Sequence, residues 1–431
     1  MILFQYNCTM RRHQKKKVST RDYRRTTCRM CASSKLYPFL SLGSMPIPNG
    51  FLEKSDLKKE ELHYPLKVCV CESCWLVQLT HTIPAEIMFK NYLYVPSVSK
   101  TMVDHFQKMA ADIISTMNPR KNDLVIDIGS NDGTLLSFFK KKHLNVLGID
   151  PAENLAKESN KRGIKTIPGY FNEDMAVMVR EKYGLAKVIT ATNVVAHIDD
   201  LHSVMKGIKK LLHPVGLFVM EAPYLIDLLD NNEFDTIYHE HLSYISIRPL
   251  MKLFEKYNLK IVDIKKQSVH GGTVRIFTAH VDSEYKIHPR VEKFVSEENL
   301  KKLHLRSTYD EFARRVKVIR RDLLHFLKRI KKEGRSIIGY GASAKGNVLT
   351  NYCNISTDIL DYIVDSTPYK QEKYTPGTHI PIYSETEVIT NTADYALLLS
   401  WNFAKEIIEK NKEFRERGGQ FIITIPYLKI I

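Results

Sequence analysis

Two acidic residues and a glycine-containing turn make up the part of this 431-residue sequence best suited to binding a small ligand. The apolar run 125–128 predicts a buried parallel strand, and Gly129 and Gly133 follow it where a helix begins. Such a turn lets a nucleotide-like ligand approach bare backbone at a helix N-terminus. A second apolar run ends at Asp150, 23 residues after Asp127. A carboxylate at that place suits the ribose hydroxyls of an adenosine ligand.

The turn departs from the dinucleotide pattern G-x-G-x-x-G, because Asn131 and Thr134 stand at the second and third glycine positions. It is similar to the first loop of class I methyltransferases, which bind S-adenosylmethionine. The similarity, together with the two acids and the order of the strands, predicts a methyltransferase. The residues predicted to contact S-adenosylmethionine are Asp127, Gly129, Asn131, Gly133, Asp150 and Asn193.

Clustered cysteines indicate a metal site. Six of the seven cysteines lie within the first 74 residues, and four of them form the pairs Cys28-x-x-Cys31 and Cys71-x-x-Cys74. Four thiolates at this spacing can close tetrahedrally on one zinc ion. Such a site has no open position, so its role would be structural. Unrelated reduced cysteines are the alternative.

Histidines occur in two segments that could carry proton transfer. His197 follows the fourth strand of the predicted sheet, where loops line the ligand crevice, although a structural role is equally compatible with that place. The segment from Tyr238 through Glu240 and His241 to Tyr244 is dense in groups that can transfer protons and orient a ligand. Its spacing differs from H-E-x-x-H, which disfavours a catalytic zinc. An exposed polar loop is the alternative.

The chain divides into five predicted segments. Alternating strand-like and helix-like patterns predict an α/β fold with a doubly wound parallel sheet, and a second glycine turn at 336–347 opens a smaller α/β domain. The cysteine-bearing part is punctuated by proline and glycine and is expected to have little regular structure of its own. The predicted segments are a basic tail (1–26), a zinc-binding module (27–85), a methyltransferase domain (86–290), a long amphipathic linking helix (291–333) and a C-terminal α/β substrate-binding domain (334–431).

The formal net charge of +16 raises the question of nucleic-acid binding. Residues 1–35 hold ten lysines or arginines and one acid, Asp22, so +9 belongs to them and +7 to the rest. This confinement favours a solvated tail, and the remaining basicity suits an anionic small substrate. No apolar run reaches the ~18 residues of a membrane span. We therefore expect a cytoplasmic protein that binds neither nucleic acid nor membranes, with a transit peptide less favoured. The oligomeric state stays open, with a monomer slightly favoured.

Taken together, the motifs resemble the nucleotide-sugar C-methyltransferases of the mycarose and tetronitrose 3-C-methyltransferase type. The resemblance covers about residues 28–425. The matching segments are Cys28-Arg29-x-Cys31, 42–46, 74–79, the Asp127 loop, 193–197, 238–241, 270–272, 342–347 and 376–382.

The resemblance implies a zinc module, a central S-adenosylmethionine domain and a C-terminal domain that helps to hold the nucleotide sugar. It implies His241 as general base, with Tyr238, Glu240 and His197 around the sugar ring. It also implies Tyr94 as a catalytic tyrosine, with Tyr92 the less favoured choice, and the four paired cysteines as zinc ligands. The departures are Ala32 for a glycine, Pro48 for a small residue, and Pro96 within the pattern that follows Tyr94.

The predicted reaction is carbon methylation next to the ketone of a 4-keto nucleotide sugar. His241 would remove the acidic hydrogen, Tyr238 or His197 would stabilise the enolate, and the Lys345 loop would cradle the diphosphate. Further predicted substrate contacts are Asn347 and Arg275. The alternatives are a zinc-containing nucleic-acid-binding protein with a relic methyltransferase domain, a methyltransferase of non-sugar small molecules, and an amino-group methyltransferase of nucleic acid. Amino-group methyltransferases of nucleic acid carry the motif Asp/Asn-Pro-Pro-Tyr/Phe after the fourth strand. Residues 192–195 of this sequence do not match that motif, which disfavours the last alternative.

Overall fold

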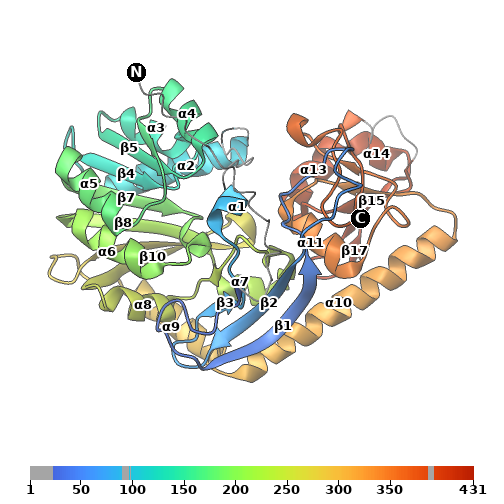
Figure 1. The fold of residues 1–431 in the computed structure, drawn as a ribbon, viewed down its shortest axis with the longest axis horizontal. Helices are drawn as coiled ribbons and strands as arrows, with labels where there is room; N and C mark the ends of the chain where they lie inside the picture. Colours follow the sequence, from blue (N-terminus) through green and yellow to red (C-terminus); the bar gives the residue numbers. More distant parts are fainter. Residues whose placement is uncertain (1–22, 90–96, 98, 387–392) are drawn as a thin grey trace, which may run out of the picture.

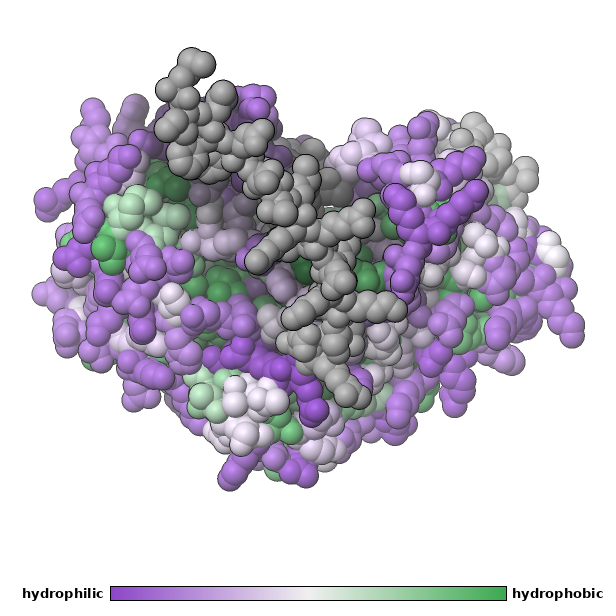
Figure 2. Space-filling model, in the orientation of Figure 1, coloured by the Kyte–Doolittle hydropathy of each residue, from purple (hydrophilic) through white to green (hydrophobic). Residues whose placement is uncertain are grey.

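The computed structural model describes residues 23–89, 97, 99–386 and 393–431. Figure 1 shows two α/β lobes side by side, with a curved sheet and a long helix beneath them. Hydrophilic residues cover most of the face seen in Figure 2, and the apolar areas between them are small. None of the helices in the described part of the chain is long and apolar enough to cross a membrane.

The larger lobe is built on a seven-stranded sheet in the order β10-β11-β8-β7-β4-β5-β6. Strands β4 to β8 run parallel, whereas β11 is antiparallel to both of its neighbours. The strands are β4 Leu124–Ile128, β5 Asn145–Asp150, β6 Thr166–Pro168, β7 Ala186–Thr192, β8 Leu212–Pro223, β10 Leu259–Gln267 and β11 Thr273–His280.

Helices cover both faces of this sheet. Successive residues of a strand point to opposite faces, and apolar residues occur at successive positions, so both faces are apolar. Val125 and Val188 pack with residues of α2 and α3, whereas Ile126 and Ile189 pack with residues of α5 and α6. The predicted doubly wound α/β fold is confirmed. The helices are α2 Lys100–Met117, α3 Thr134–Lys140, α4 Glu153–Lys161, α5 Glu173–Tyr183, α6 Leu201–Leu211, α7 Leu225–Asp230 and α8 Ile247–Glu255.

The cysteine-bearing segment forms a four-stranded antiparallel sheet in the order β1-β2-β3-β9, so the expectation of little regular structure is wrong. Its last strand comes from the larger lobe, and helices α10 (Arg306–Lys332) and α11 (Ala344–Cys353) pack against β1. The cysteine-bearing segment is too small to form an apolar core of its own, and the rest of the chain supplies the apolar residues that pack against it. The strands are β1 Leu36–Met45, β2 Tyr64–Cys71, β3 Val77–Leu79 and β9 Ser243–Tyr244, and the short helix α1 Ala85–Phe89 follows β3.

The predicted basic tail, residues 1–26, extends too far. Arg24 forms an antiparallel bridge with His81, and the backbone N–H of Arg25 donates to Thr80 O at 2.8 Å. The Arg25 guanidinium lies 2.7 Å from Asp199 Oδ1. So short a segment pairs through its backbone and does not produce a periodic pattern of apolar residues in the sequence. The point at which the folded part of the chain begins could therefore not be predicted from the sequence.

The predicted linking helix over 291–333 is two helices, α9 Arg290–Leu300 and α10. Lys302 between them has a φ of 55°, a left-handed conformation that a right-handed helix cannot contain. The apolar positions predicted to face the core of α10 are all buried: Phe312, Val316, Ile319, Leu323, Phe326 and Ile330. In Figure 1 this helix runs from beneath the larger lobe to the smaller one.

The smaller lobe contains the predicted second α/β domain. Its six-stranded sheet has the order β14-β13-β12-β15-β16-β17 and is parallel apart from β17. The strands are β12 Ile337–Tyr340, β13 Ile363–Val364, β14 Ile382–Tyr383, β15 Tyr395–Leu398, β16 Gln420–Ile423 and β17 Lys429–Ile430, and its further helices include α13 Ala404–Lys410 and α14 Lys412–Glu416.

Candidate active site

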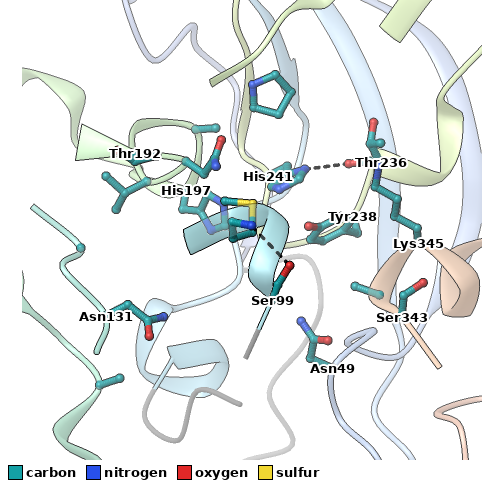
Figure 3. A pocket seen from close by; sticks show the side chains of 18 of the residues that line it. Asn49, Ser99, Asn131, Thr192, His197, Thr236, Tyr238, His241, Ser343 and Lys345 are labelled. Carbon is teal, nitrogen blue, oxygen red and sulfur yellow. Dashed lines mark hydrogen bonds between the residues drawn. The ribbon is translucent and has the colours of Figure 1, made fainter. Parts of the chain in front are cut away.

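A cavity of about 1330 Å³ lies where the two lobes and the cysteine-bearing sheet segment meet. A site for one small ligand typically measures ~300–1,000 Å³, so this cavity has room for two. Its wall includes Asn131 and His241 from the larger lobe, Asn49 from the cysteine-bearing segment and Lys345 from the smaller lobe (Figure 3). The carboxyl ends of parallel strands from both sheets face it, which is where such sheets bind ligands.

The turn between β4 and α3 lines the cavity with residues 129–132. Gly129 and Gly133 have φ values of 70° and 77°. A Cβ on Gly129 would lie 2.8 Å from a methyl carbon of Val194, and one on Gly133 would lie 2.5 Å from Ser159 Oγ. Conformation and space therefore both require glycine at these two positions.

Asp150 ends β5 beside this turn. Its carboxylate accepts hydrogen bonds from the backbone N–H groups of Asn131 and Ala152, each at 2.8 Å. Asp127 on β4 accepts from the Thr190 hydroxyl at 2.7 Å, and burial raises the pKa of Asp127 to about 7. Both acids line the cavity, so carboxylate oxygens are available to a ligand with hydroxyl groups.

Asn193 follows β7 with a left-handed φ of 56°. Within the described part of the chain its buried Oδ1 has no hydrogen-bond donor. An unsatisfied buried acceptor costs ~1–3 kcal/mol, so this oxygen is suited to a donor on a ligand. Five of the residues predicted to contact S-adenosylmethionine line the cavity, and the sixth, Gly133, is the N-cap of α3 behind them. The glycine-containing turn, the acids and this acceptor fit an adenosine-bearing ligand.

Three ring side chains meet in the middle of the cavity wall. The rings of Tyr238 and His241 have centroids 3.9 Å apart, and those of His197 and His241 are 4.9 Å apart (Figure 3). Nδ1 of His241 lies 2.7 Å from Thr236 O. A carbonyl oxygen only accepts, so Nδ1 carries the proton and Nε2 is the basic nitrogen. Burial lowers the pKa of His197 to about 4, so that ring is neutral near pH 7.

The loops that carry the two histidines are joined through their backbones. The N–H of Leu242 donates to Ala196 O at 2.8 Å, one residue away from a histidine on each side. The same loop continues into β9, which pairs with β3 of the cysteine-bearing sheet. Proximity of His197 and His241, 44 residues apart in sequence, is therefore a product of the tertiary fold.

Glu240 does not line the cavity. It is 1% exposed, and its Oε1 accepts a hydrogen bond from Asn49 Nδ2 at 2.6 Å. Asn49, which the sequence analysis missed, lines the cavity in its place. The only feature of the sequence that marks Asn49 is its place in the turn 46–50. The prolines and glycine of this turn predict a loop but not a ligand-binding role. Tyr94 and the alternative Tyr92 lie outside the described residues.

Of the three predicted substrate contacts in the C-terminal half, only Lys345 reaches the cavity. Its Nζ is buried 4.6 Å from the centre of the Trp401 ring, without a hydrogen-bond acceptor in the described part of the chain. Asn347 instead donates to Pro48 O at 2.6 Å. Arg275 lies in the sheet, 2.6 Å from Glu221 Oε1. Asn347 and Arg275 therefore do not line the cavity, and direct contact of either residue with a substrate stays a prediction.

The four paired cysteines come together away from the cavity. Their sulfur atoms all lie within 4.8 Å of one another, with Cys28 and Cys74 at 3.5 Å and Cys31 and Cys71 at 3.5 Å. Four sulfurs bound tetrahedrally at ~2.3 Å from one zinc ion would be ~3.8 Å apart, so the cluster fits zinc. It offers four thiolates and no open position, which suits a structural ion.

The cysteine-bearing segment supports the backbone beside both histidines. Arg29, next to Cys28, has a fully buried side chain whose Nε lies 2.9 Å from Asp199 Oδ1, two residues beyond His197. Gln78 of β3 pairs with Ser243 of β9, two residues beyond His241. Folding of the cysteine cluster is therefore coupled structurally to the position of the two imidazoles.

Comparisons with known proteins agree with this architecture. Three family models match in succession: a zinc binding domain over residues 28–89, a methyltransferase domain over 102–264 and a C-methyltransferase C-terminal domain over 268–426. The chain is 38% identical over 404 residues to "C-methyltransferase NovU" of Streptomyces niveus, covering 94% of this chain and 96% of that protein.

Two further comparisons match less of the chain. "Ubiquinone biosynthesis O-methyltransferase" of Actinobacillus pleuropneumoniae is 24% identical over 214 residues, covering 39% of this chain and 88% of that protein. A solved structure of magnesium protoporphyrin IX methyltransferase from Synechocystis with bound SAH covers 44% of this chain and 90% of that one, with 15% identity and a TM-score of 0.33.

Proposed function

The chain belongs to the C-methyltransferase family with an N-terminal zinc-binding domain, and on that premise we propose that its acceptor is a nucleotide-linked 4-keto-deoxysugar. The enzyme is an S-adenosylmethionine-dependent methyltransferase with a structural zinc site. The proposal adds the class of acceptor, the reacting carbon next to the ketone, and the roles of individual residues.

The observation that supports the proposal is that one arrangement, a carboxylate that accepts from two backbone N–H groups, occurs in both lobes at the wall of one cavity. Asp150 ends the strand after the first glycine turn and accepts from two backbone N–H groups. In the smaller lobe Asp365 follows β13 and likewise accepts from the backbone N–H groups of Ala342 and Thr367, each at 2.8 Å. Both acids line the cavity. Two nucleoside-type sites in one cavity suit a nucleoside donor and a nucleotide-linked acceptor.

Lys345 supports an anionic linkage in that acceptor. The side chain extends from the turn that opens α11, and its buried ammonium group lacks an acceptor in the described part of the chain. The ammonium group interacts electrostatically with the carboxyl groups of Glu233 and Asp235, but among the described residues its N–H donors are buried without an acceptor. Buried donors without an acceptor are costly, and a diphosphate oxygen would satisfy them. The part of the cavity that the smaller lobe lines would therefore bind the nucleoside diphosphate, and the sugar would extend toward the larger lobe.

His241 is suited to remove a proton from carbon. Its Nε2 carries the lone pair, because Nδ1–H is held by Thr236 O. The hydrogen next to a ketone is acidic, since the electron pair left behind spreads onto the carbonyl oxygen. Neutral His197 and the Tyr238 hydroxyl can donate to that oxygen as its negative charge develops. S-Adenosylmethionine, when bound, supplies an electrophilic methyl group on a sulfonium sulfur.

A mass-spectrometric screen of nucleotide 4-keto sugars tests this proposal. Each sugar is incubated with the purified chain and S-adenosylmethionine, and a gain of one methylene unit in the product is sought. We expect the gain for at least one deoxysugar and none for the corresponding sugar lacking the ketone. Methylation of the non-keto sugar to the same extent would contradict the enolate route.

Replacing Asp150 with alanine is expected to raise the dissociation constant of S-adenosylmethionine about tenfold to a hundredfold, because hydrogen bonds to a charged group contribute ~1.5–3 kcal/mol. Isothermal titration calorimetry measures the effect. Asp174→Ala, at an exposed carboxylate in the first turn of α5, is the matched control and should bind the donor normally. Equal affinity of the two variants would remove Asp150 from the donor site.

A further inference from the structure

Asn49 is carried into the cavity by the cysteine-bearing segment. It follows the buried end of β1, in a turn closed by the Gly50 N–H donating to Ile47 O at 3.0 Å. Figure 3 shows its side chain at the cavity, where Tyr238 and Lys345 also point. Asn49 is thus a polar contribution of this segment to a cavity otherwise formed mainly by the two lobes.

The orientation of the Asn49 amide is set by Glu240. A carboxylate oxygen only accepts, so the amide group 2.6 Å from Glu240 Oε1 is the donor Nδ2. The Oδ1 atom and the second N–H bond of the amide are then left for other partners. Glu240 is 1% exposed and reaches the cavity through Asn49. It is therefore placed to orient a ligand-binding side chain.

The backbone around Asn49 is held by the smaller lobe. Asn347 Nδ2 donates to Pro48 O at 2.6 Å, and both groups are buried. Farther along, Leu52 and Tyr374 exchange two backbone hydrogen bonds of 2.9 Å each. Asn49 thus lies between an anchor in the smaller lobe and an orienting carboxylate in the larger lobe, which fixes both its backbone and its rotamer.

We propose that Asn49 binds the sugar ring of the acceptor through its side-chain amide, and that Glu240 and Asn347 are positioning residues for it. The inference rests on the proposed function, because it takes the acceptor to be a nucleotide sugar. The amide oxygen would accept from a ring hydroxyl, and the free N–H would donate to a ring oxygen. A sugar lacking that hydroxyl would leave the amide oxygen unpaired in the complex, so Asn49 also contributes to acceptor specificity.

The test is steady-state kinetics of the full-length enzyme with the nucleotide 4-keto sugar that gives turnover. Asn49→Ala is expected to raise KM for the sugar about tenfold to thirtyfold, as for loss of a hydrogen bond to a bound hydroxyl. The dissociation constant of S-adenosylhomocysteine should stay within about twofold, since the donor half is untouched. The control Asn145→Ala removes an exposed amide that donates to Asn122 O, and it should leave KM unchanged.

Substitutions at Glu240 separate positioning from a merely structural role. Glu240→Met keeps the volume and removes the acceptor, so it should raise KM as Asn49→Ala does. Glu240→Gln retains an acceptor oxygen and should restore most of the affinity. In the Glu240→Met background, Asn49→Ala should add less than about twofold, because the two side chains act as one unit.

The outcomes distinguish the inference from the function on which it rests. An Asn49→Ala enzyme with an unchanged KM, or independent effects of Asn49→Ala and Glu240→Met, would overturn the inference and leave the methyl transfer established. Failure of the unsubstituted enzyme to methylate any nucleotide sugar would overturn both.

Discussion

Replacing His241 with asparagine is expected to lower kcat about 10²- to 10⁴-fold, the range of a positioned general base. The asparagine amide can still donate to Thr236 O, which accepts from His241 Nδ1 at 2.7 Å, so the loop should keep its conformation. No basic nitrogen would remain at the place of Nε2. Calorimetry should give an unchanged affinity for S-adenosylmethionine, whose predicted site is at the β4–α3 turn.

His202→Asn is the matched control for this prediction. His202 is a half-buried histidine of α6 whose Nδ1 lies 2.7 Å from the Tyr257 hydroxyl, outside the cavity. This variant should retain the kcat of the unsubstituted enzyme. Full activity of His241→Asn would remove the residue as the base. His197 could not take over as the general base near pH 7. Burial lowers the pKa of His197 to about 4, and an efficient general base has a pKa near the working pH.

Removing zinc is expected to abolish methyl transfer, although the cysteine cluster lies outside the cavity. Structural zinc contributes ~10–16 kcal/mol in small zinc domains, so the metal-free segment should unfold. The contacts of Arg29 with Asp199 and of β3 with β9 would then be lost beside both histidines. We expect chelation to lower the thermal midpoint and kcat together, with zinc release followed by a colorimetric indicator.

Two serine variants on the same strand make this prediction specific. Cys71→Ser removes a thiolate from the cluster and should lose zinc and activity. Cys69→Ser changes a buried cysteine outside the cluster, whose Sγ lies 3.6 Å from Gln78 O, a carbonyl to which a serine hydroxyl can donate. It should keep the zinc. Loss of zinc with full retention of kcat would contradict the coupling between the cluster and the active site.

Local patterns in the sequence were enough to identify the strand–turn–helix units, the cysteine pairs and the segment that contains His241. Each is a run of neighbouring residues whose hydrophobic period or spacing reflects one element. Buried positions such as Val316 and Leu323 in α10 follow directly from that period. The break before α10 depends on a single left-handed residue, Lys302, which no local pattern marked.

Features that depend on contacts between distant segments were not predictable. Asn49 meets Glu240 191 residues away, and β9 joins a sheet whose other strands lie near the N-terminus. Arg275 was predicted to contact substrate because it follows a glycine pair, but its strand points it toward Glu221. The sequence thus indicated which residue types were available, whereas the tertiary fold decided which of them reach the cavity.

The most direct test of the central claim is hydrogen exchange at the carbon next to the ketone. The nucleotide 4-keto sugar is incubated in D₂O with the enzyme and S-adenosylhomocysteine, so that no methyl group can be transferred, and deuterium uptake is followed by NMR. We predict exchange at this carbon with the unsubstituted enzyme and only background exchange with His241→Asn. Methylation of the same sugar by an enzyme that catalyses no exchange above background would contradict the account.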